Sequence, residues 1–163
     1  MKKWLYLVGF VLVSGGGYLA AAHFSGGAFP TLGLPLGGDL GWLRKTSLSF
    51  WEDIQFKDFV KAATYHTPEN QADIDIPYLL ERLFGVKPEF LDIMETEVVL
   101  ADIDSTQLRA RVKTRLKIKL LLNGRIEDRE VMLYFHRKST DAPWFMELES
   151  SLRALKADED KQH

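Results

Sequence analysis

The segment around His66 carries the residues best suited to acid–base chemistry. Asp73 follows in the same short stretch, and a histidine beside a carboxylate can act as a general base where both reach a substrate. The alternative is structural, because a histidine in the last turn of a helix interacts favourably with the helix dipole and its free carbonyl groups. We expect the structural role, with Asp73 and Asp75 at the start of the next helix, and therefore no catalytic residue.

No metal or cofactor site is expected. The chain has no cysteine, and its histidines are scattered over the sequence: His23, His66, His136 and His163. This composition argues against a zinc site. The Asp73–Asp75 spacing lacks the glycine and the distal glutamate of a calcium-binding loop.

A row of basic side chains could bind an anionic surface. It occupies alternate positions between residues 107 and 122: Arg109, Arg111, Lys113, Arg115, Lys117 and Lys119. Alternate residues of a strand share one face, so the row alone would suit phosphates or anionic lipid head groups. Acidic residues of the neighbouring strands are expected to compensate it, with a two-residue turn at Asn123-Gly124 setting the register. The expected pairs are Lys119–Asp128, Lys117–Glu130, Lys113–Glu97 and Arg115–Glu95.

Three arginines are left without an acidic partner in this arrangement. Arg109 and Arg111, with Arg137 near by, are the candidate contacts for a protein partner. The formal net charge of the chain is -2. Nucleic acid is therefore not expected as a partner.

Aromatic and apolar side chains between the expected helices and sheet could form a second kind of site, a ligand pocket. The candidates for lining a pocket for a small apolar ligand are Trp51, Tyr65, Tyr78, Met94, Thr114, Trp144 and Met146. The residues expected on the inner face of the sheet include no acid or base: Met94, Thr96, Val98, Leu100, Ala110, Val112, Thr114, Leu116, Val131, Leu133, Phe135, Trp144, Met146, Leu148 and Ser150. Such a face either fills a core or encloses a ligand. It offers no titratable group for catalysis.

The elements that position these residues are helices followed by strands. The pattern predicts a helix over 49–65, opened by Ser49 and Glu52 at capping-box spacing, and a second helix from Asp75 to Gly85. Period-two alternation then predicts strands over 93–101, 107–122, 125–136 and 143–153. The expected fold is α+β over residues 47–155, with the helices packed on one face of a curved, four-stranded antiparallel meander. Residues 156–163 are expected to be a disordered tail.

The N-terminus predicts an export or anchoring segment. Lys2 and Lys3 precede an apolar stretch from Trp4 to Phe24, which as a helix is long enough to cross a bilayer. As an anchor it would place residues 4–24 in a bacterial inner membrane, with the N-terminus cytoplasmic and the domain periplasmic. As a signal peptide it would be cleaved near Ala22 and release the domain into the periplasm. Residues 1–24 are thus an anchor or signal, and 25–46 a linker rich in glycine and proline, in which residues 25–41 are expected to form no helix or strand.

The order of elements resembles the NTF2-like (cystatin-like α+β roll) superfamily. The resemblance is carried by FWEDIQFKDFVKAA as the covering helix and LRARVKTRLKIKLLLNGRIEDREVMLYFHRK as the central hairpin. That superfamily includes isomerases, dehydratases, small-molecule binders and non-catalytic assembly modules. Its isomerases of the ketosteroid type place Asp, Tyr or His on the concave face, where this chain has apolar residues and threonine. A single membrane helix before such a domain also resembles the inner-membrane scaffold subunits of type IV secretion systems.

Three functions follow from these observations. The first is a non-catalytic, membrane-tethered interaction or assembly module of the bacterial envelope, binding a protein partner or forming a homo-oligomer. The second is a periplasmic carrier of a small apolar ligand held between helices and sheet. The third is an enzyme that uses His66 and Asp73. We expect the first.

Overall fold

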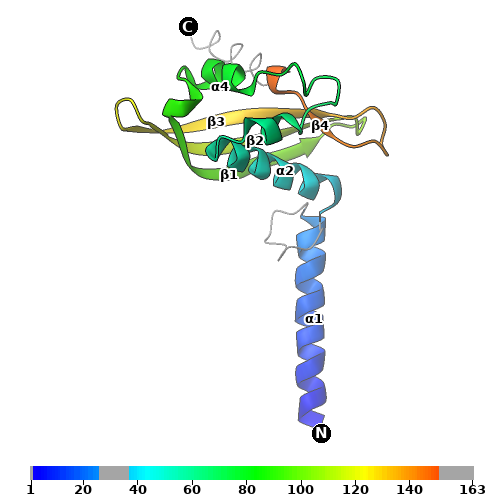
Figure 1. Cartoon of the computed structure of the whole chain (residues 1–163). Coiled ribbons are helices and arrows are strands. Elements are labelled where there is room, and N and C mark those ends of the chain that lie inside the picture. The colour runs from blue at the N-terminus through cyan, green and yellow to red at the C-terminus, as the bar shows by residue number, and fades with distance from the viewer. Residues whose placement is uncertain (1, 26–36, 151–163) are drawn as a thin grey trace. The chain divides into compact units, whose positions relative to one another are not determined.

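The chain forms two compact units, Met1–Arg44 and Lys45–His163, and the computed structural model describes residues 2–25 and 37–150. The first unit contains helix α1 (Lys2–Phe24), so the N-terminal segment is helical as expected (Figure 1). Ser25 closes it, since its N–H donates to Ala21 O and its Oγ to Ala22 O, both at 3.0 Å. In the described part of the chain, no helix combines the length and the apolar character needed to span a membrane.

Helix α2 (Gly38–Gln55) begins well before the expected residue 49. The prediction that residues 38–41 lack a helix, and that the linker extends to residue 46, is therefore wrong, and Ser49 lies inside α2 instead of capping it. Residues 26–36 lie outside the described residues. Gly38 has a φ of 55°, which glycine adopts without strain, and the negative charge of Asp39 in the first turn suits the positive end of the helix dipole. The buried side of α2 includes Thr46 and Ser47. Because these two buried positions carry polar residues, the hydrophobic residues alone do not show the helical period in the sequence.

The helix expected over 49–65 is interrupted. Helix α2 ends at Gln55, and a separate short helix, α3 (Phe59–Ala63), follows. Lys57 adopts a φ of 60° in the interruption, and the carboxylate of Asp58 caps the first turn of α3. The Lys57 ammonium group donates to two backbone carbonyls at the start of the sheet, Pro88 O just before it at 2.7 Å and Leu91 O of its first residue at 2.5 Å. These contacts are distant in sequence, so the local pattern does not reveal the break.

Helix α4 (Ile76–Phe84) confirms the second expected helix. Asp75 caps it by accepting a hydrogen bond from Tyr78 N at 2.9 Å, and Pro77 occupies its first turn. At its end Gly85 has a φ of 70° and donates to Glu81 O at 2.8 Å. A short 3-10 turn, η1 (Pro88–Phe90), leads into the sheet. Local capping chemistry is thus sufficient to define this helix.

The sheet is a four-stranded antiparallel meander in the order β1-β2-β3-β4, which confirms the α+β class. Its strands are β1 (Leu91–Ile103), β2 (Arg109–Leu120), β3 (Arg125–His136) and β4 (Phe145–Met146). The fourth strand is much shorter than the expected 143–153, because residues 148–150 are helical; residues 151–153 lie outside the described residues. Trp144, Met146 and Leu148 are all buried. Alternating burial therefore continues past the point where the strand ends.

The β2–β3 hairpin is shifted by two residues from the expected register. Lys117 lies opposite Asp128, and Lys119 lies opposite Ile126. The expected pairs Lys119–Asp128 and Lys117–Glu130 are therefore wrong, because the loop takes residues 121–124 instead of two residues. A shift of two positions leaves each side chain on its expected face.

Strand β1 contains two bulges, between Ile93 and Glu95 and between Val98 and Leu100. Each bulge inserts one residue and changes which face the following side chains occupy. Met94 is 48% exposed and Leu100, paired with Lys113 of the outer face, is 42% exposed. The prediction that these two side chains face the core is wrong for this reason.

The core lies between the helices and the inner face of the sheet (Figure 1). Helix α2 contributes Trp51, whose Nε1 donates to Thr114 Oγ1 of β2 at 3.0 Å, and whose ring lies 6.1 Å from that of Phe84 in α4. The expected inward residues of β2 and β3 are buried: Ala110, Val112, Thr114, Leu116, Val131, Leu133 and Phe135. The helices therefore cover one face and leave the other to the charged side chains.

Candidate interaction surface

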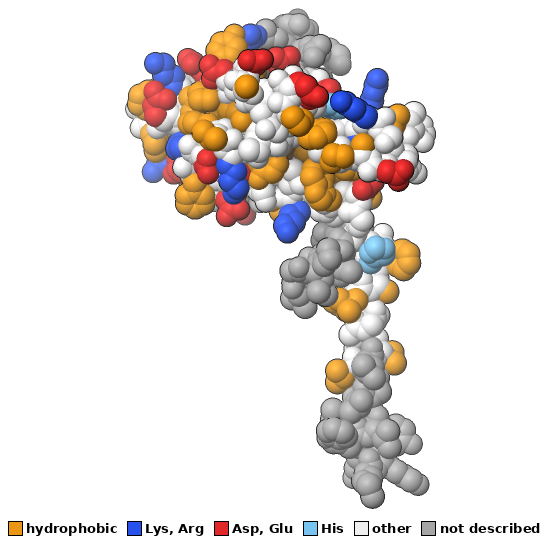
Figure 2. Space-filling model, turned by 45° about the vertical axis from the view of Figure 1, so that its right-hand side comes forward, with side chains coloured by type: hydrophobic (Ala, Val, Ile, Leu, Met, Phe, Trp, Pro, Cys, Tyr) orange, Lys and Arg blue, Asp and Glu red, His pale blue; other side chains and the backbone are white. Residues whose placement is uncertain are grey.

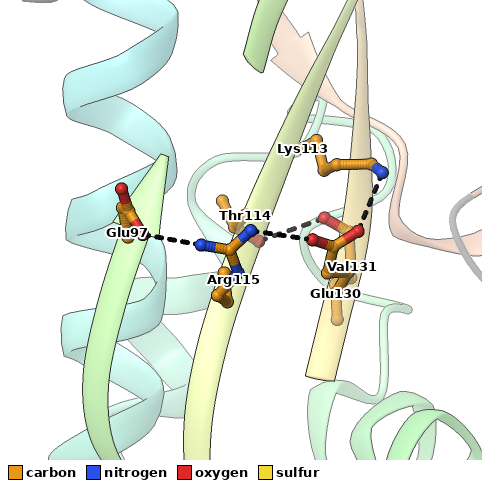
Figure 3. A network of polar contacts seen from close by, with 6 residues as sticks. All are labelled: Glu97, Lys113, Thr114, Arg115, Glu130 and Val131. Carbon is orange, nitrogen blue, oxygen red and sulfur yellow. Dashed lines mark hydrogen bonds and ion pairs between the residues drawn. The ribbon is translucent and has the colours of Figure 1, made fainter. Parts of the chain in front are cut away.

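The outer face of the sheet carries a network of ion pairs at its centre (Figure 3). Arg115 contacts Glu97 of β1 and Glu130 of β3, each at 3.2 Å, and Lys113 contacts the second oxygen of Glu130 at 2.8 Å. The basic row is thus compensated by acids, as expected, but Glu97 pairs with Arg115 and not with Lys113, and Glu95 lies opposite Lys117 and not Arg115. The exchange of partners arises in the register between β1 and β2, where Val98 lies opposite Thr114.

Glu130 offers a direct test of this network. Hydrogen bonds from Lys113 and then Arg115 hold the pKa of Glu130 below its ordinary value of 4.5. We expect the Glu130 carboxyl resonance to titrate below 4.5 in the wild type, and closer to it in Lys113→Gln and Arg115→Gln. Because the folded pKa is depressed, the stabilisation exists above the ordinary pKa and disappears as the pH falls through the folded value.

Lys117→Gln is the matched control for that titration, because Lys117 lies opposite Asp128 and Glu95. It should leave the Glu130 midpoint unchanged in a carbon-detected NMR titration. An identical midpoint in wild type and both test variants would contradict the network. Added salt should bring the wild-type midpoint closer to the ordinary value, since exposed ion pairs are screened.

Arg111 is paired, contrary to the expectation that it lacks an acidic partner. Its Nη2 and Nε lie 3.0 and 3.2 Å from Asp102 Oδ2. The bulge after Val98 brings Asp102 opposite Arg111 in the ladder. Both side chains remain about half exposed, at 54% and 48%. Such a pair contributes little stability and can exchange partners easily.

A cleft of about 610 Å³ opens at this end of the sheet. Its lining brings the sequence-derived candidates Arg109 and Arg111 together with Tyr134 and His136, which lie opposite them in the ladder. His136 Nδ1 lies 3.0 Å from Glu147 Oε1, and Asp102, Asp104 and Ser150 complete the polar lining. Tyr134, His136 and Glu147 are not among the residues that the sequence pattern indicated for this site. The hairpin register is the signal that could have placed the first two.

On the face of the domain seen in Figure 2, acidic and basic side chains are interspersed, with hydrophobic side chains between them. Such mixed surfaces favour partners by complementarity more than by net charge. The cleft itself combines two arginines with three carboxylates among its described lining residues. It therefore suits a polar partner surface better than a simple anion.

Arg137, the third arginine that the sequence singled out, is buried, with 7% of its surface exposed. Its Nε donates to Gln107 O at 2.7 Å, and its guanidinium carbon lies 4.3 Å from the centre of the Trp144 ring. This stacking orders the chain between β3 and β4. The Arg137 side chain therefore makes contacts within the domain, whereas the sequence led us to expect it to contact a partner.

The ligand-pocket candidates fall into two groups. Trp51 and Thr114 are fully buried and bonded to each other, while Thr114 Oγ1 donates on to Val131 O at 3.1 Å. Trp144 and Met146 are also buried, at 5% and 2% exposure. Tyr78 and Met94 lie at the surface, at 52% and 48%. The structure thus brings Trp51 and Thr114 together and leaves Tyr78 and Met94 apart from them.

Tyr65 belongs to a polar cluster at the edge of this core. Its Oη donates to Asp53 Oδ2 at 2.8 Å, and Lys61 Nζ contacts Asp53 Oδ1 at 2.7 Å. Burial, and then the hydrogen bond to Asp53, raise the pKa of Tyr65 well above its ordinary value. The phenol therefore stays protonated and acts as a donor. Its backbone oxygen accepts from Met146 N at 2.8 Å, which ties β4 to the helices.

His66 and Asp73 line one small cavity, so the structure brings the two expected partners to the same place. His66 lies just beyond α3, with Nδ1 3.3 Å from Ala63 O, which is the helix-terminal contact expected from the sequence. Burial lowers the pKa of His66. Asp75 caps α4, whereas Asp73 does not. Over residues 2–25 and 37–150, no group of three or more potential ligands is arranged to hold a metal ion.

No family model matches the chain, and no curated protein matches it.

Proposed function

We propose that this chain is a non-catalytic interaction module of the bacterial envelope, with an NTF2-like domain that binds a protein partner through the Arg109–Arg111 cleft. Residues 4–24 anchor it in the inner membrane and the domain lies in the periplasm. The observation that carries the proposal is the cleft, because it gathers two arginines, a tyrosine and a histidine at an accessible end of the polar sheet face. Arginine and tyrosine are the residue types most enriched at interaction hot spots.

The chemistry of the two sheet faces supports a binding role. The buried residues of β2 and β3 on the inner face are apolar except for Thr114, whose hydroxyl is engaged on both sides by Trp51 and Val131. The charged Glu127 and Arg129 lie on this face toward the hairpin loop, opposite Ile118 and Leu116. Trp51 occupies the space in which a carrier of this fold would hold an apolar ligand. The outer face keeps its charged groups accessible. A protein partner is therefore favoured over an apolar cargo.

The basic start and the apolar stretch of the N-terminus support the membrane location. Lys2 and Lys3 are followed by no formally charged residue before Asp39. The positive-inside bias places such a start in the cytoplasm. Retention of the intact 18.6 kDa chain in washed membranes is the corresponding observation. A shortened chain in the soluble envelope fraction would favour cleavage near Ala22.

The partner contact is tested by site-specific photo-crosslinking in intact cells. A benzoylphenylalanine at Arg109 should give one defined crosslinked product, and Arg111→Glu in the same chain should reduce its yield about tenfold, as for an interface arginine worth 1.4 kcal/mol. The matched control carries the probe at Arg125, which is 70% exposed at the opposite end of the hairpin. Equal crosslinking at both positions, or no effect of Arg111→Glu, would overturn the proposal.

A further inference from the structure

Four exposed apolar side chains gather at one end of the sheet. Leu121 and Leu122 lie in the loop of the β2–β3 hairpin, Ile126 is the second residue of β3, and Phe90 directly precedes β1. Between 36% and 65% of each is exposed. The N–H of Leu121 donates to Phe90 O at 2.9 Å, which holds the two segments together. Single exposed apolar side chains are normal, whereas a group of them marks a contact surface; we call these four residues the apolar tip.

The hairpin loop holds its leucines in a defined position. Gly124 has a φ of 70° and donates to Leu120 O at 2.8 Å, while Asn123 Oδ1 accepts from Arg125 N at 2.9 Å. Asn123 and Gly124 thus meet the needs of the turn, and nothing in it calls for leucine at the two preceding positions. The loop projects beyond the helices at this end of the domain (Figure 1). The leucines are therefore available for an external contact.

The charged residues beside the apolar tip compensate one another. Arg125 and Arg129 contact Glu127 at 3.2 and 2.8 Å, and Lys119 lies opposite Asp92 in the ladder. The surroundings therefore offer charged side chains of both signs and no strong field of one sign. An apolar centre with such a rim suits the boundary between lipid head groups and acyl chains. It does not require an anionic lipid.

The apolar tip belongs to a chain with an N-terminal apolar helix. Helix α1 ends at Phe24 and α2 begins at Gly38, so the chain between them spans at most about 45 Å when fully extended. In the proposed membrane location, α1 is the anchor and this short connection keeps the domain within reach of the lipid surface. Tethering raises the effective concentration of the bilayer around the domain, so that even a small apolar contact forms readily.

We propose that the apolar tip inserts into the surface of the bilayer that anchors the chain. Leu121 and Leu122 enter the boundary between head groups and acyl chains, and the charged rim stays among the head groups. This docking rests on the proposed membrane location. The Arg109–Arg111 cleft lies at the other end of the strands, roughly 30 Å from the loop along β2. Docking therefore orients the domain and leaves the cleft open to a partner.

The test measures the depth of the tip by electron paramagnetic resonance. The full-length chain is reconstituted into phosphatidylcholine vesicles, and because it contains no cysteine, Leu122→Cys carries a single nitroxide. This nitroxide should be more accessible to oxygen than to a water-soluble nickel chelate, as expected in lipid. The matched control is Ser105→Cys, in the exposed β1–β2 loop at the opposite end of the sheet, which should stay accessible to nickel. Phosphatidylglycerol in equal proportion should leave the depth unchanged.

Substitutions in the labelled chain separate the tip from other exposed apolar groups. Leu121→Ser with Ile126→Ser should lower the ratio of inserted to free tips about tenfold, because the exposed parts of both side chains no longer gain from transfer into lipid. Val60→Ser removes an apolar group that is 83% exposed on α3 and should leave the ratio unchanged. All three substituted side chains are exposed, so the fold should be retained, which circular dichroism checks. Equal effects of the two changes would overturn the docking.

Flotation of the vesicles distinguishes this inference from the proposed membrane location. A chain that does not float with the lipid would contradict the anchor, and the docking with it. A floating chain whose nitroxide at residue 122 is as accessible to nickel as the one at residue 105 would contradict the docking alone. Spin–spin broadening that grows with the protein-to-lipid ratio would show that the tip contacts a second copy of the chain instead of lipid. A tip exposed to water in vesicles but shielded in native membranes would assign it to another protein.

Discussion

Replacement of Trp51 by alanine is expected to lower the free energy of unfolding by about 4 kcal/mol. The indole is fully buried between α2 and the sheet, with ring contacts to Phe50 at 5.0 Å and to Phe84 at 6.1 Å. Its loss leaves a cavity that the surrounding strands and helices fill only in part. It also leaves Thr114 without its donor. The measurement is urea unfolding of the full-length protein in detergent, followed by far-ultraviolet circular dichroism.

Phe56→Ala is the matched control, because Phe56 is an aromatic residue directly after the same helix and is 73% exposed. It should cost about 0.5 kcal/mol or less. Thr114→Val should cost about 1–2 kcal/mol, because it keeps the shape and leaves the Trp51 N–H without an acceptor. A loss for Trp51→Ala no larger than that for Phe56→Ala would show that α2 does not pack on the sheet as described.

The second large effect is expected for Asp53→Ala, at about 2 kcal/mol. The Asp53 side chain is 6% exposed and accepts from Lys61 Nζ at 2.7 Å and Tyr65 Oη at 2.8 Å. Lys61, whose side chain is 59% exposed, returns to water when the carboxylate is removed. The half-buried Tyr65 hydroxyl loses its acceptor and accounts for most of the loss. The same urea titration measures it.

A double-mutant cycle apportions this effect between the two partners. Lys61→Met alone should cost less than about 1 kcal/mol, as an ion pair open to solvent. Tyr65→Phe should cost about 1 kcal/mol, and its effect should vanish in the Asp53→Ala background. Strict additivity of Asp53→Ala and Tyr65→Phe would contradict the hydrogen bond between them.

The sequence pattern located elements whose signals are local. Asp75, Pro77 and Gly85 act within a single helix, so the bounds of α4 follow from capping chemistry and are confirmed. Alternation in β2 and β3 identified their inner faces, because the side-chain period of a strand does not depend on its neighbours. The two-residue register shift between β2 and β3 did not affect this assignment, since a shift of two residues leaves each side chain on the same face.

Elements set by distant contacts were missed. The break at Lys57 depends on carbonyl groups of Pro88 and Leu91. The early start of α2 depends on a buried side that includes Thr46 and Ser47, which no hydrophobic period reveals. The bulges in β1 depend on the fit of an edge strand to β2, and they turned Leu100 outward. In each case the decisive partner lies in another element.

The candidate sites also combine features that the sequence indicates locally with features that depend on distant contacts. Arg109, Arg111, His66 and Asp73 could be chosen from the sequence because their side-chain chemistry is intrinsic. Only the tertiary structure fixed the register that puts His136 opposite Arg109 and Tyr134 opposite Arg111, buried Arg137 against Trp144, and left His66 Nε2 without a partner among the described residues. The sequence by itself determines the residue types and the spacing of apolar residues within one helix or strand. Burial, register and the satisfaction of polar atoms depend on which segments meet, and only the folded domain determines that.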